Sequence, residues 1–200
     1  MNDFGPDLLS LSAHKIGGPQ GVGALVLADG IEPRSLLLGG GQERRRRGGT
    51  ENLPGIAGFG AAAEDALAEM GSMSRLGGWR DRLEEAAARI APIQVFGGNG
   101  ERLANTSCFA TPGLTSEALI MTLDLDGVAI SAGSACSSGK VAVSHVLDAM
   151  GIGGELGRSV IRVSLGWNSE ESDVDGFLDA YRRAVQRAGI FPAVKPAAVA

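Results

Sequence analysis

The stretch "LLSLSAHKIGGPQGVGALVLA", residues 8–28, decides the fold expected for this chain. Its first part, residues 8–14, alternates apolar and small polar residues, which predicts a buried strand. Its last part, residues 21–28, predicts a second strand that the chain enters through a glycine-rich turn. Lys15 lies between the two, directly after the first strand. Strands joined by tight glycine turns favour an α/β protein.

The composition fits that fold class. The chain has 200 residues, of which 31 are glycine, 44% are hydrophobic and 20% are charged. The hydrophobic and charged fractions are ordinary for a globular protein and supply enough apolar side chains for a core, whereas the glycine content is high. High glycine content with many alanines favours tight turns and close packing of helices on sheets, and the chain has no G-x-y period.

Charge and cysteine content exclude several classes of protein. The net charge is −5, which argues against general nucleic-acid binding. Two cysteines, Cys108 and Cys136, are too few for a disulfide framework, so a reducing compartment is expected. The first residues lack the basic and apolar regions of a signal peptide, and no apolar run approaches the ~20 residues of a membrane span. We therefore expect a cytoplasmic protein with no membrane contact.

The rest of the chain divides into further predicted elements. Helical spacing predicts helices over residues 52–70, with Asn52 as N-cap, and 74–91. Strands are expected at 93–96, 105–110, 128–133 and 159–166, and helices at 115–127, 144–151 and 170–189.

The character of the sequence changes near Gly71–Ser74, where a strand-and-loop region gives way to alternating helices and strands. We therefore expect one domain over residues 1–72 and a smaller α/β domain over residues 73–190. The Pro/Ala-rich end, residues 191–200, is expected to be disordered.

Lys15 is the first candidate for chemistry. A lysine held between a small-residue strand and a glycine turn has restricted motion, which suits an amine that forms a Schiff base. By strand alternation Ser12 and His14 lie on one side and could both donate to one anionic group, such as a phosphate. Spacing alone leaves open the alternative of an ordinary surface lysine at a strand–turn junction.

The second candidate is "GGGQERRRRGGTEN", residues 39–52. Its glycines let backbone amides approach a phosphate or carboxylate, and Thr50 adds a hydroxyl donor. The alternatives are a solvated basic loop or a nucleic-acid patch, and the acidic net charge disfavours the latter.

The third candidate is Cys136, in the small-residue stretch "SAGSACSSGK" at residues 131–140. Nothing bulky is near to bury it, so an accessible, nucleophilic thiol is expected, with an incidental exposed thiol as the alternative. Cys108 instead lies in a strand pattern, which predicts a buried and inert cysteine.

The fourth candidate is Arg162, which interrupts the apolar strand "SVIRVSLG". An arginine in that place needs an anionic partner, because burying an unpaired charge is costly. The partner is either a substrate carboxylate held bidentately or a structural salt bridge.

In this order and at these separations, the four stretches resemble the cysteine desulfurases, which are class V, fold-type I enzymes that use pyridoxal 5′-phosphate (PLP). The resemblance runs from about Asp7 to Gly189, and the short cysteine loop followed by "VSHVLDAMG" is similar to the branch serving nitrogenase and iron–sulfur assembly. It implies the C-terminal part of a PLP-dependent transferase large domain plus a smaller α/β C-terminal domain.

The resemblance also implies an activity: L-cysteine loses its sulfur to give L-alanine and a persulfide on Cys136, which passes to an iron–sulfur scaffold or another acceptor protein. Cys136 becomes a candidate iron–sulfur ligand through that persulfide, shared with a scaffold. The other implied roles are Lys15 as the Schiff-base lysine, Ser12 and His14 as phosphate ligands, Thr50 as a donor to the phosphate of the partner subunit in a homodimer, and Arg162 as the carboxylate clamp.

What matches begins just before the lysine, so only the C-terminal half of the family's chain is represented. The family's residues that stack on the PLP ring and pair with its pyridine nitrogen have no counterpart here, and we expect a truncated form. One alternative is a non-catalytic fragment or sulfur-relay module of the same family. Another is a different class V PLP enzyme, a transaminase or lyase, against which the Cys136 loop argues.

Overall fold

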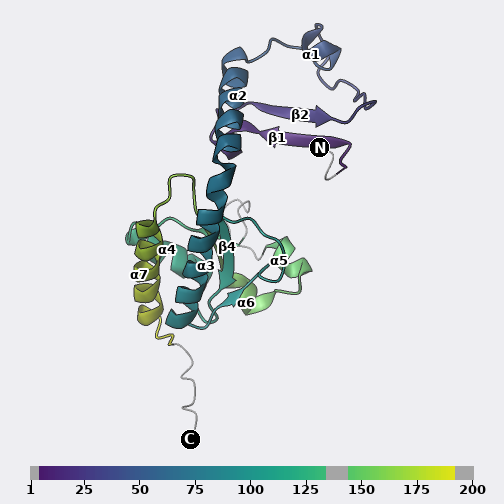
Figure 1. The fold of residues 1–200 in the computed structure, drawn as a ribbon. Coiled ribbons are helices and arrows are strands. Elements are labelled where there is room, and N and C mark those ends of the chain that lie inside the picture. The colour runs from purple at the N-terminus through teal and green to yellow at the C-terminus, as the bar shows by residue number, and fades with distance from the viewer. Residues whose placement is uncertain (1–4, 134–143, 192–200) are drawn as a thin grey trace, which may run out of the picture. The chain divides into compact units, whose positions relative to one another are not determined.

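The structure is a computed structural model that describes residues 5–133 and 144–191. It divides into two compact units, Met1–Gly71 and Ser72–Ala200, and each is described by itself (Figure 1). Both units combine helices with strands, which confirms the expected fold class. In the described part of the chain, no helix combines the length and apolar character needed to cross a bilayer.

The N-terminal unit is built on an antiparallel hairpin. Strand β1 (Leu8–Ser12) pairs with β2 (Gly23–Leu27), with Leu8 opposite Leu27 and Ser12 opposite Gly23. Between the strands, η1 (Ala13–Ile16) forms one turn of 3-10 helix. The remaining helices of this unit are α1 (Gln42–Arg45) and α2 (Leu53–Ala68), and α2 packs against η1.

Helix α2 begins where the sequence predicts. The Asn52 side chain accepts a hydrogen bond from the Gly55 amide at 3.2 Å, and Pro54 lies in the first turn, where its missing N–H costs nothing. The prediction of Asn52 as N-cap is confirmed. It could be made from sequence because a cap depends on contacts within four residues.

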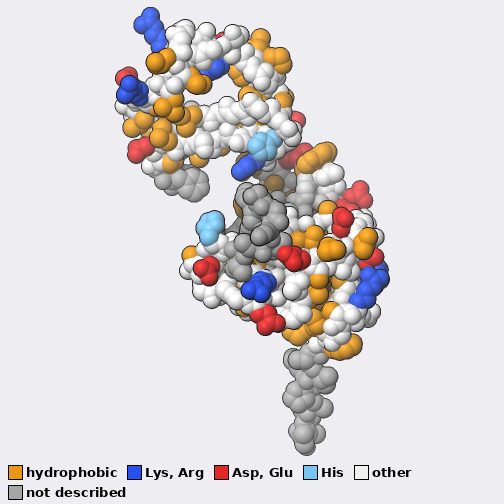
Figure 2. Space-filling model, turned by 180° about the vertical axis from the view of Figure 1, so that it is seen from behind, with side chains coloured by type: hydrophobic (Ala, Val, Ile, Leu, Met, Phe, Trp, Pro, Cys, Tyr) orange, Lys and Arg blue, Asp and Glu red, His pale blue; other side chains and the backbone are white. Residues whose placement is uncertain are grey.

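The first strand is not buried as the alternating pattern predicts. Leu8 is 51% exposed and Leu25 on the neighbouring strand is 55% exposed. The reason is that their sheet has two strands, and a two-stranded ribbon cannot form a core by itself. Figure 2 shows hydrophobic side chains on the surface of this unit.

The C-terminal unit contains an antiparallel four-stranded sheet with the order β3-β4-β6-β5. Its strands are β3 (Gln94–Val95), β4 (Thr106–Ala110), β5 (Ser131–Ala132) and β6 (Val160–Ser164). All four fall inside predicted strands, but β5 is shorter than the predicted 128–133.

Helices cover both faces of this sheet (Figure 1). One face carries α3 (Met73–Ile90), α4 (Ser116–Leu125) and α7 (Glu171–Arg187), and the other carries α5 (His145–Ala149) and α6 (Gly154–Arg158). Short η2 (Glu69–Ser72) precedes α3. Helix α6 was not predicted, because it has five residues, two of them glycines, and no apolar periodicity.

The core of this unit centres on Tyr181 of α7, which is fully buried. The Phe177 ring stacks on it with centroids 5.8 Å apart, and the Phe109 ring meets it edge-on at 5.9 Å. The phenol lies 2.8 Å from the hydroxyl of buried Thr111, so the polar end of the ring has a partner.

Tyr181 is the chain's single tyrosine, so its titration can be followed by tyrosinate absorbance. Burial raises its pKa to about 12, with the Thr111 hydrogen bond acting in the opposite direction. We expect no tyrosinate near pH 10, where an unfolded tyrosine is half ionised. Because the folded pKa is raised, the associated stability is complete below about pH 10 and is lost as the pH rises toward 12. Half ionisation near pH 10 in the folded chain would contradict the prediction.

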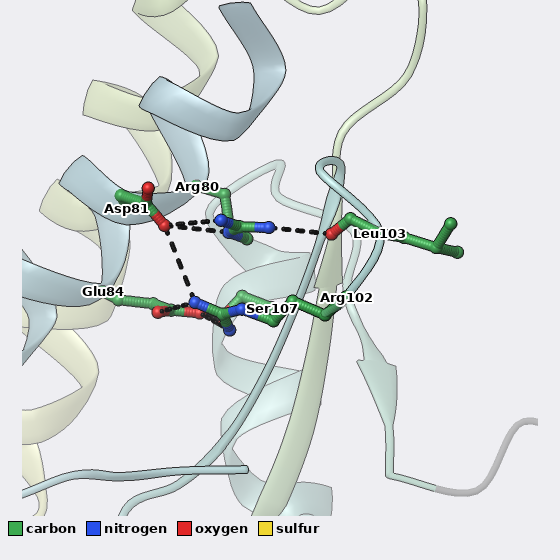
Figure 3. Close-up of polar contacts among 6 residues, drawn as sticks. All are labelled: Arg80, Asp81, Glu84, Arg102, Leu103 and Ser107. Carbon is green, nitrogen blue, oxygen red and sulfur yellow. Dashed lines mark hydrogen bonds and ion pairs between the residues drawn. The ribbon is translucent and has the colours of Figure 1, made fainter. Parts of the chain in front are cut away.

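A polar cluster ties the segment before β4 to α3 (Figure 3). Glu84, with a side chain 11% exposed, receives two hydrogen bonds of 2.7 Å from Arg102 and one from the Ser107 hydroxyl. Arg80 bonds Asp81 and the backbone carbonyl of residue 103. The bidentate pair holds the start of β4 against the helix.

Candidate functional site

Lys15 lies on the turn that ends β1. Ser12 is the last residue of the strand, and the chain then coils into η1, where the Ala13 carbonyl accepts hydrogen bonds from Gly17 and Gly18. Gly17 has a φ of 84°, a left-handed conformation that glycine adopts without strain. Ala13 is fully buried while Lys15 is exposed, so the turn is anchored at one residue and presents the amine.

The predicted strand over residues 8–14 is therefore too long by two residues. Strand alternation cannot place His14 beside Ser12, because His14 belongs to the 3-10 turn. The hydrogen bonds that Gly17 and Gly18 donate to Ala13 favour the turn over a longer ladder. The two residues still flank the buried Ala13, one on each side, and both are exposed.

Three polar side chains of this turn have no protein partner in the part of the chain that the structure describes. Among residues 5–133 and 144–191, no hydrogen bond or ion pair involves the Ser12 hydroxyl, the His14 imidazole or the Lys15 amine. One amine, one imidazole and one hydroxyl are thus exposed on this turn and available to a ligand. This set fits a group that carries both a carbonyl carbon and a phosphate.

Thr50 lies in the same unit, in the segment before α2, and is exposed. Arg47 bonds the Gly48 carbonyl at 3.0 Å and the Thr50 carbonyl at 3.4 Å, so one arginine of the basic run stabilises the backbone of the loop. The basic run is therefore not a uniformly solvated loop.

The arginine run also has a backbone feature that sequence reasoning missed. Glu43, Arg44 and Arg45 have φ values of 51°, 57° and 69°. A left-handed turn costs non-glycine residues roughly 1–2 kcal/mol each, and such strain concentrates at functional sites. Glycines flanking the run are the only sequence signal, and they do not specify which residues adopt the left-handed conformation.

Arg162 belongs to the C-terminal unit, where β6 runs between β4 and β5. It lies opposite Cys108 on one side and opposite Ser131 on the other. Its neighbours Ile161 and Val163 point into the main core, so alternation puts Arg162 on the other face. Its Nε atom is buried and donates to no acceptor within the described residues. An unsatisfied guanidinium nitrogen is costly and fits an anionic ligand.

Of the two cysteines, the structure describes Cys108 and does not describe Cys136. Cys108 is half-buried beside Arg162; burial raises the pKa of its thiol, and the Arg162 charge partly lowers it. This is the environment of an inert thiol. Cys136 lies outside the described residues, in the segment 134–143 that begins two residues after β5. In the described part of the chain, no cluster of histidine, cysteine and acidic residues could hold a metal ion.

Comparisons with known proteins agree with this architecture. The model of the aminotransferase class-V family matches residues 1–177. A cysteine desulfurase from Cereibacter sphaeroides is 45% identical over 174 residues, which cover 86% of this chain and 44% of the relative. The cysteine desulfurase IscS from Dictyoglomus turgidum is 40% identical over 189 residues, which cover 94% of this chain and 48% of the relative.

Solved structures give the same result. A NifS-like protein from Rickettsia africae superposes with a TM-score of 0.83 at 31% identity, over 92% of this chain and 49% of that protein. The chain spans about half the length of the curated relatives it matches. The family match includes the lysine turn, the arginine run, the cysteine segment and Arg162. The chain therefore belongs to the aminotransferase class-V family.

Proposed function

We propose that this chain carries the C-terminal part of a PLP-dependent cysteine desulfurase, which converts L-cysteine to L-alanine and an enzyme persulfide. The observation that carries the proposal is the 45% identity to a cysteine desulfurase across most of the chain. The exposed Lys15 amine, Ser12 hydroxyl and His14 imidazole support it, since PLP carries an aldehyde and a phosphate.

When bound, PLP would supply the electron-withdrawing ring that stabilises negative charge at the substrate Cα. The residues of this chain would do the rest. Lys15 Nζ would bind the cofactor's aldehyde carbon and, once displaced by substrate, accept the Cα proton as general base. Ser12 and His14 would hold the phosphate.

Arg162 would orient the substrate in this scheme. Its buried Nε has no described partner, and a carboxylate held bidentately would satisfy it with charge-assisted hydrogen bonds. The Cys136 thiolate would then attack the substrate sulfur. A sulfur–sulfur bond forms, the substrate's carbon–sulfur bond breaks with its electron pair moving to carbon, and alanine leaves after protonation.

The proposed partners follow from the same scheme. An acceptor such as an iron–sulfur scaffold protein would take the sulfur from Cys136, which would act as an iron–sulfur ligand only through its persulfide. A homodimer would bring exposed Thr50 to the partner subunit's phosphate. We propose a cytoplasmic location, as expected for a chain with two cysteines, too few for a disulfide framework.

A second candidate is a non-catalytic sulfur-relay module. The exposed leucines of β1 and β2 favour it, because the described strands of the N-terminal unit are not buried while the C-terminal unit has a full core. This candidate keeps Cys136 and does not need cofactor bound at Lys15.

The test uses the 200-residue chain with PLP and L-cysteine, and measures alanine release and persulfide by mass spectrometry. We expect Cys136→Ser to abolish the persulfide while borohydride still traps the cofactor on Lys15. Cys108→Ser is the matched control and should retain the persulfide, because that thiol is half-buried with a raised pKa.

Two results separate the candidates. Persulfide that appears on Cys136 only from a donor protein, with no cofactor trapped on Lys15, would favour the relay module. Persulfide on Cys108 in place of Cys136 would contradict both.

A further inference from the structure

We propose that Gly58 of α2 is a positioning residue that fixes the Lys15 turn by letting Pro19 pack directly on the helix backbone. The inference rests on the proposed function for the role of Lys15, but the contact itself is independent of that role. Pro19 lies four residues after Lys15, in the glycine-rich segment that leads into β2.

The contact at Gly58 leaves no room for a side chain. A Cβ placed on Gly58 would lie 2.6 Å from Pro19 Cγ and 3.0 Å from Pro19 Cδ. Real Cβ atoms do not approach so closely, and the proline ring has no rotamer that withdraws both atoms. Any side chain at this position must therefore move the backbone of the turn.

A second contact lies one helical turn further along α2. A Cβ on Gly18 would lie 3.0 Å from Ala13 Cβ and 3.2 Å from Ala62 Cβ. Positions 58 and 62 share one face of a helix. The turn thus rests on α2 through Pro19 and Gly18, and the second contact reaches Ala13, the buried anchor of η1.

Helix propensity does not account for a glycine at position 58. Glycine in a helix interior costs about 1 kcal/mol relative to alanine. Gly60, on the same helix, has nothing within 4 Å of its Cβ position. Alanine at position 60 should therefore only stabilise α2, whereas alanine at position 58 must displace Pro19.

The matched pair Gly58→Ala and Gly60→Ala tests the inference. The full chain is incubated with PLP, reduced with borohydride and digested, and the modified lysines are mapped by mass spectrometry. Three lysines, Lys15, Lys140 and Lys195, are distinguishable in this way. We expect Gly58→Ala to lower the trapping rate at Lys15 about tenfold, since misplacement on the order of 1 Å costs up to a hundredfold. Gly60→Ala should trap like the parent.

Rescue separates positioning from general destabilisation. The contacting atoms are Pro19 Cγ and Cδ. Adding Pro19→Ala to Gly58→Ala removes the clash, and the methyl added at position 58 takes up part of the space that the proline ring vacates, so the double variant should regain most of the trapping that either single substitution loses. A merely destabilised α2 would not be rescued by a change on the turn. Should Gly58→Ala fail to fold, Pro19→Ala alone is the second variant, and it should loosen the turn and slow trapping at Lys15.

A cofactor-independent measurement distinguishes failure of this inference from failure of the proposed function. If the parent traps no PLP at Lys15, the proposed function fails, and the acetylation rate of Lys15 by acetic anhydride then tests the positioning. Gly58→Ala should change the ratio of the acetylation rate of Lys15 to that of Lys195, whereas Gly60→Ala should leave this ratio unchanged. Parent-like trapping and acetylation in folded Gly58→Ala would overturn the inference.

Discussion

Replacing Phe109 by alanine is expected to lower the free energy of unfolding of the C-terminal unit by about 3–5 kcal/mol. Phe109 is fully buried in β4, and its ring meets Tyr181 edge-on at 5.9 Å. The substitution removes the burial of the aromatic ring, leaves a cavity in a close-packed core and deletes the aromatic pair. A loss of this size is a large fraction of the stability of a typical domain.

Urea unfolding followed by tryptophan fluorescence measures this effect, since half-buried Trp79 packs against the same core. Phe191→Ala is the matched control: that side chain is 68% exposed, and its removal should change stability by less than about 0.5 kcal/mol. If Phe109→Ala and Phe191→Ala lowered the free energy of unfolding equally, the core around Tyr181 would not be the stabilising element.

Helices α2 and α4 show which parts of the fold were predictable. Each starts at a residue whose side chain caps the first turn: Asn52 bonds the Gly55 amide, and Thr115 bonds the Ala118 amide at 3.3 Å. Capping depends on neighbours within four residues, so the sequence signals it directly. The long apolar periodicities of α3 and α7 are local signals of the same kind.

Burial of the first strand was not predictable by the same means. Alternation shows which residues share a face but does not show whether anything covers that face. Leu8 and Leu25 have the pattern of a buried sheet and are exposed on a two-stranded one. The lengths of strands such as β5 depend on pairing with residues some thirty positions away, as in the register of Ser131 with Arg162.

The candidate site divides in the same way. Ser12, His14 and Lys15 are contiguous, so the sequence could group them, although the exact end of the strand was wrong. The unsatisfied Nε of Arg162 depends on three strands meeting and has no sequence signal beyond a charge in an apolar run. The role of Gly58 could be recognised only from its contact with Pro19, because a glycine in an alanine-rich helix does not by itself indicate a packing contact.

If Arg162 clamps the substrate carboxylate as proposed, Arg162→Met is expected to weaken carboxylate binding at least about a hundredfold. The same substitution should leave the C-terminal unit as stable or up to about 1 kcal/mol more stable. The two effects share a cause. The buried Nε has no acceptor among the described residues, so the folded state bears an uncompensated desolvation cost. Methionine fills similar space without that cost, but it cannot form the bidentate, charge-assisted pair worth several kcal/mol to a desolvated carboxylate.

Two measurements check the two halves of this prediction. Urea unfolding gives the stability change, and cysteine titration of the PLP-loaded chain, followed by the cofactor's visible absorbance, gives the affinity. Arg158→Met, at an exposed arginine in the last turn of α6, is the control and should alter neither quantity appreciably.

A third readout is the alkylation rate of Cys108. The Arg162 charge lowers the pKa of the Cys108 thiol, so losing that charge should slow alkylation of Cys108 in a Cys136→Ser background. Marked destabilisation by Arg162→Met with unchanged cysteine affinity would make Arg162 a structural residue and remove it from the site.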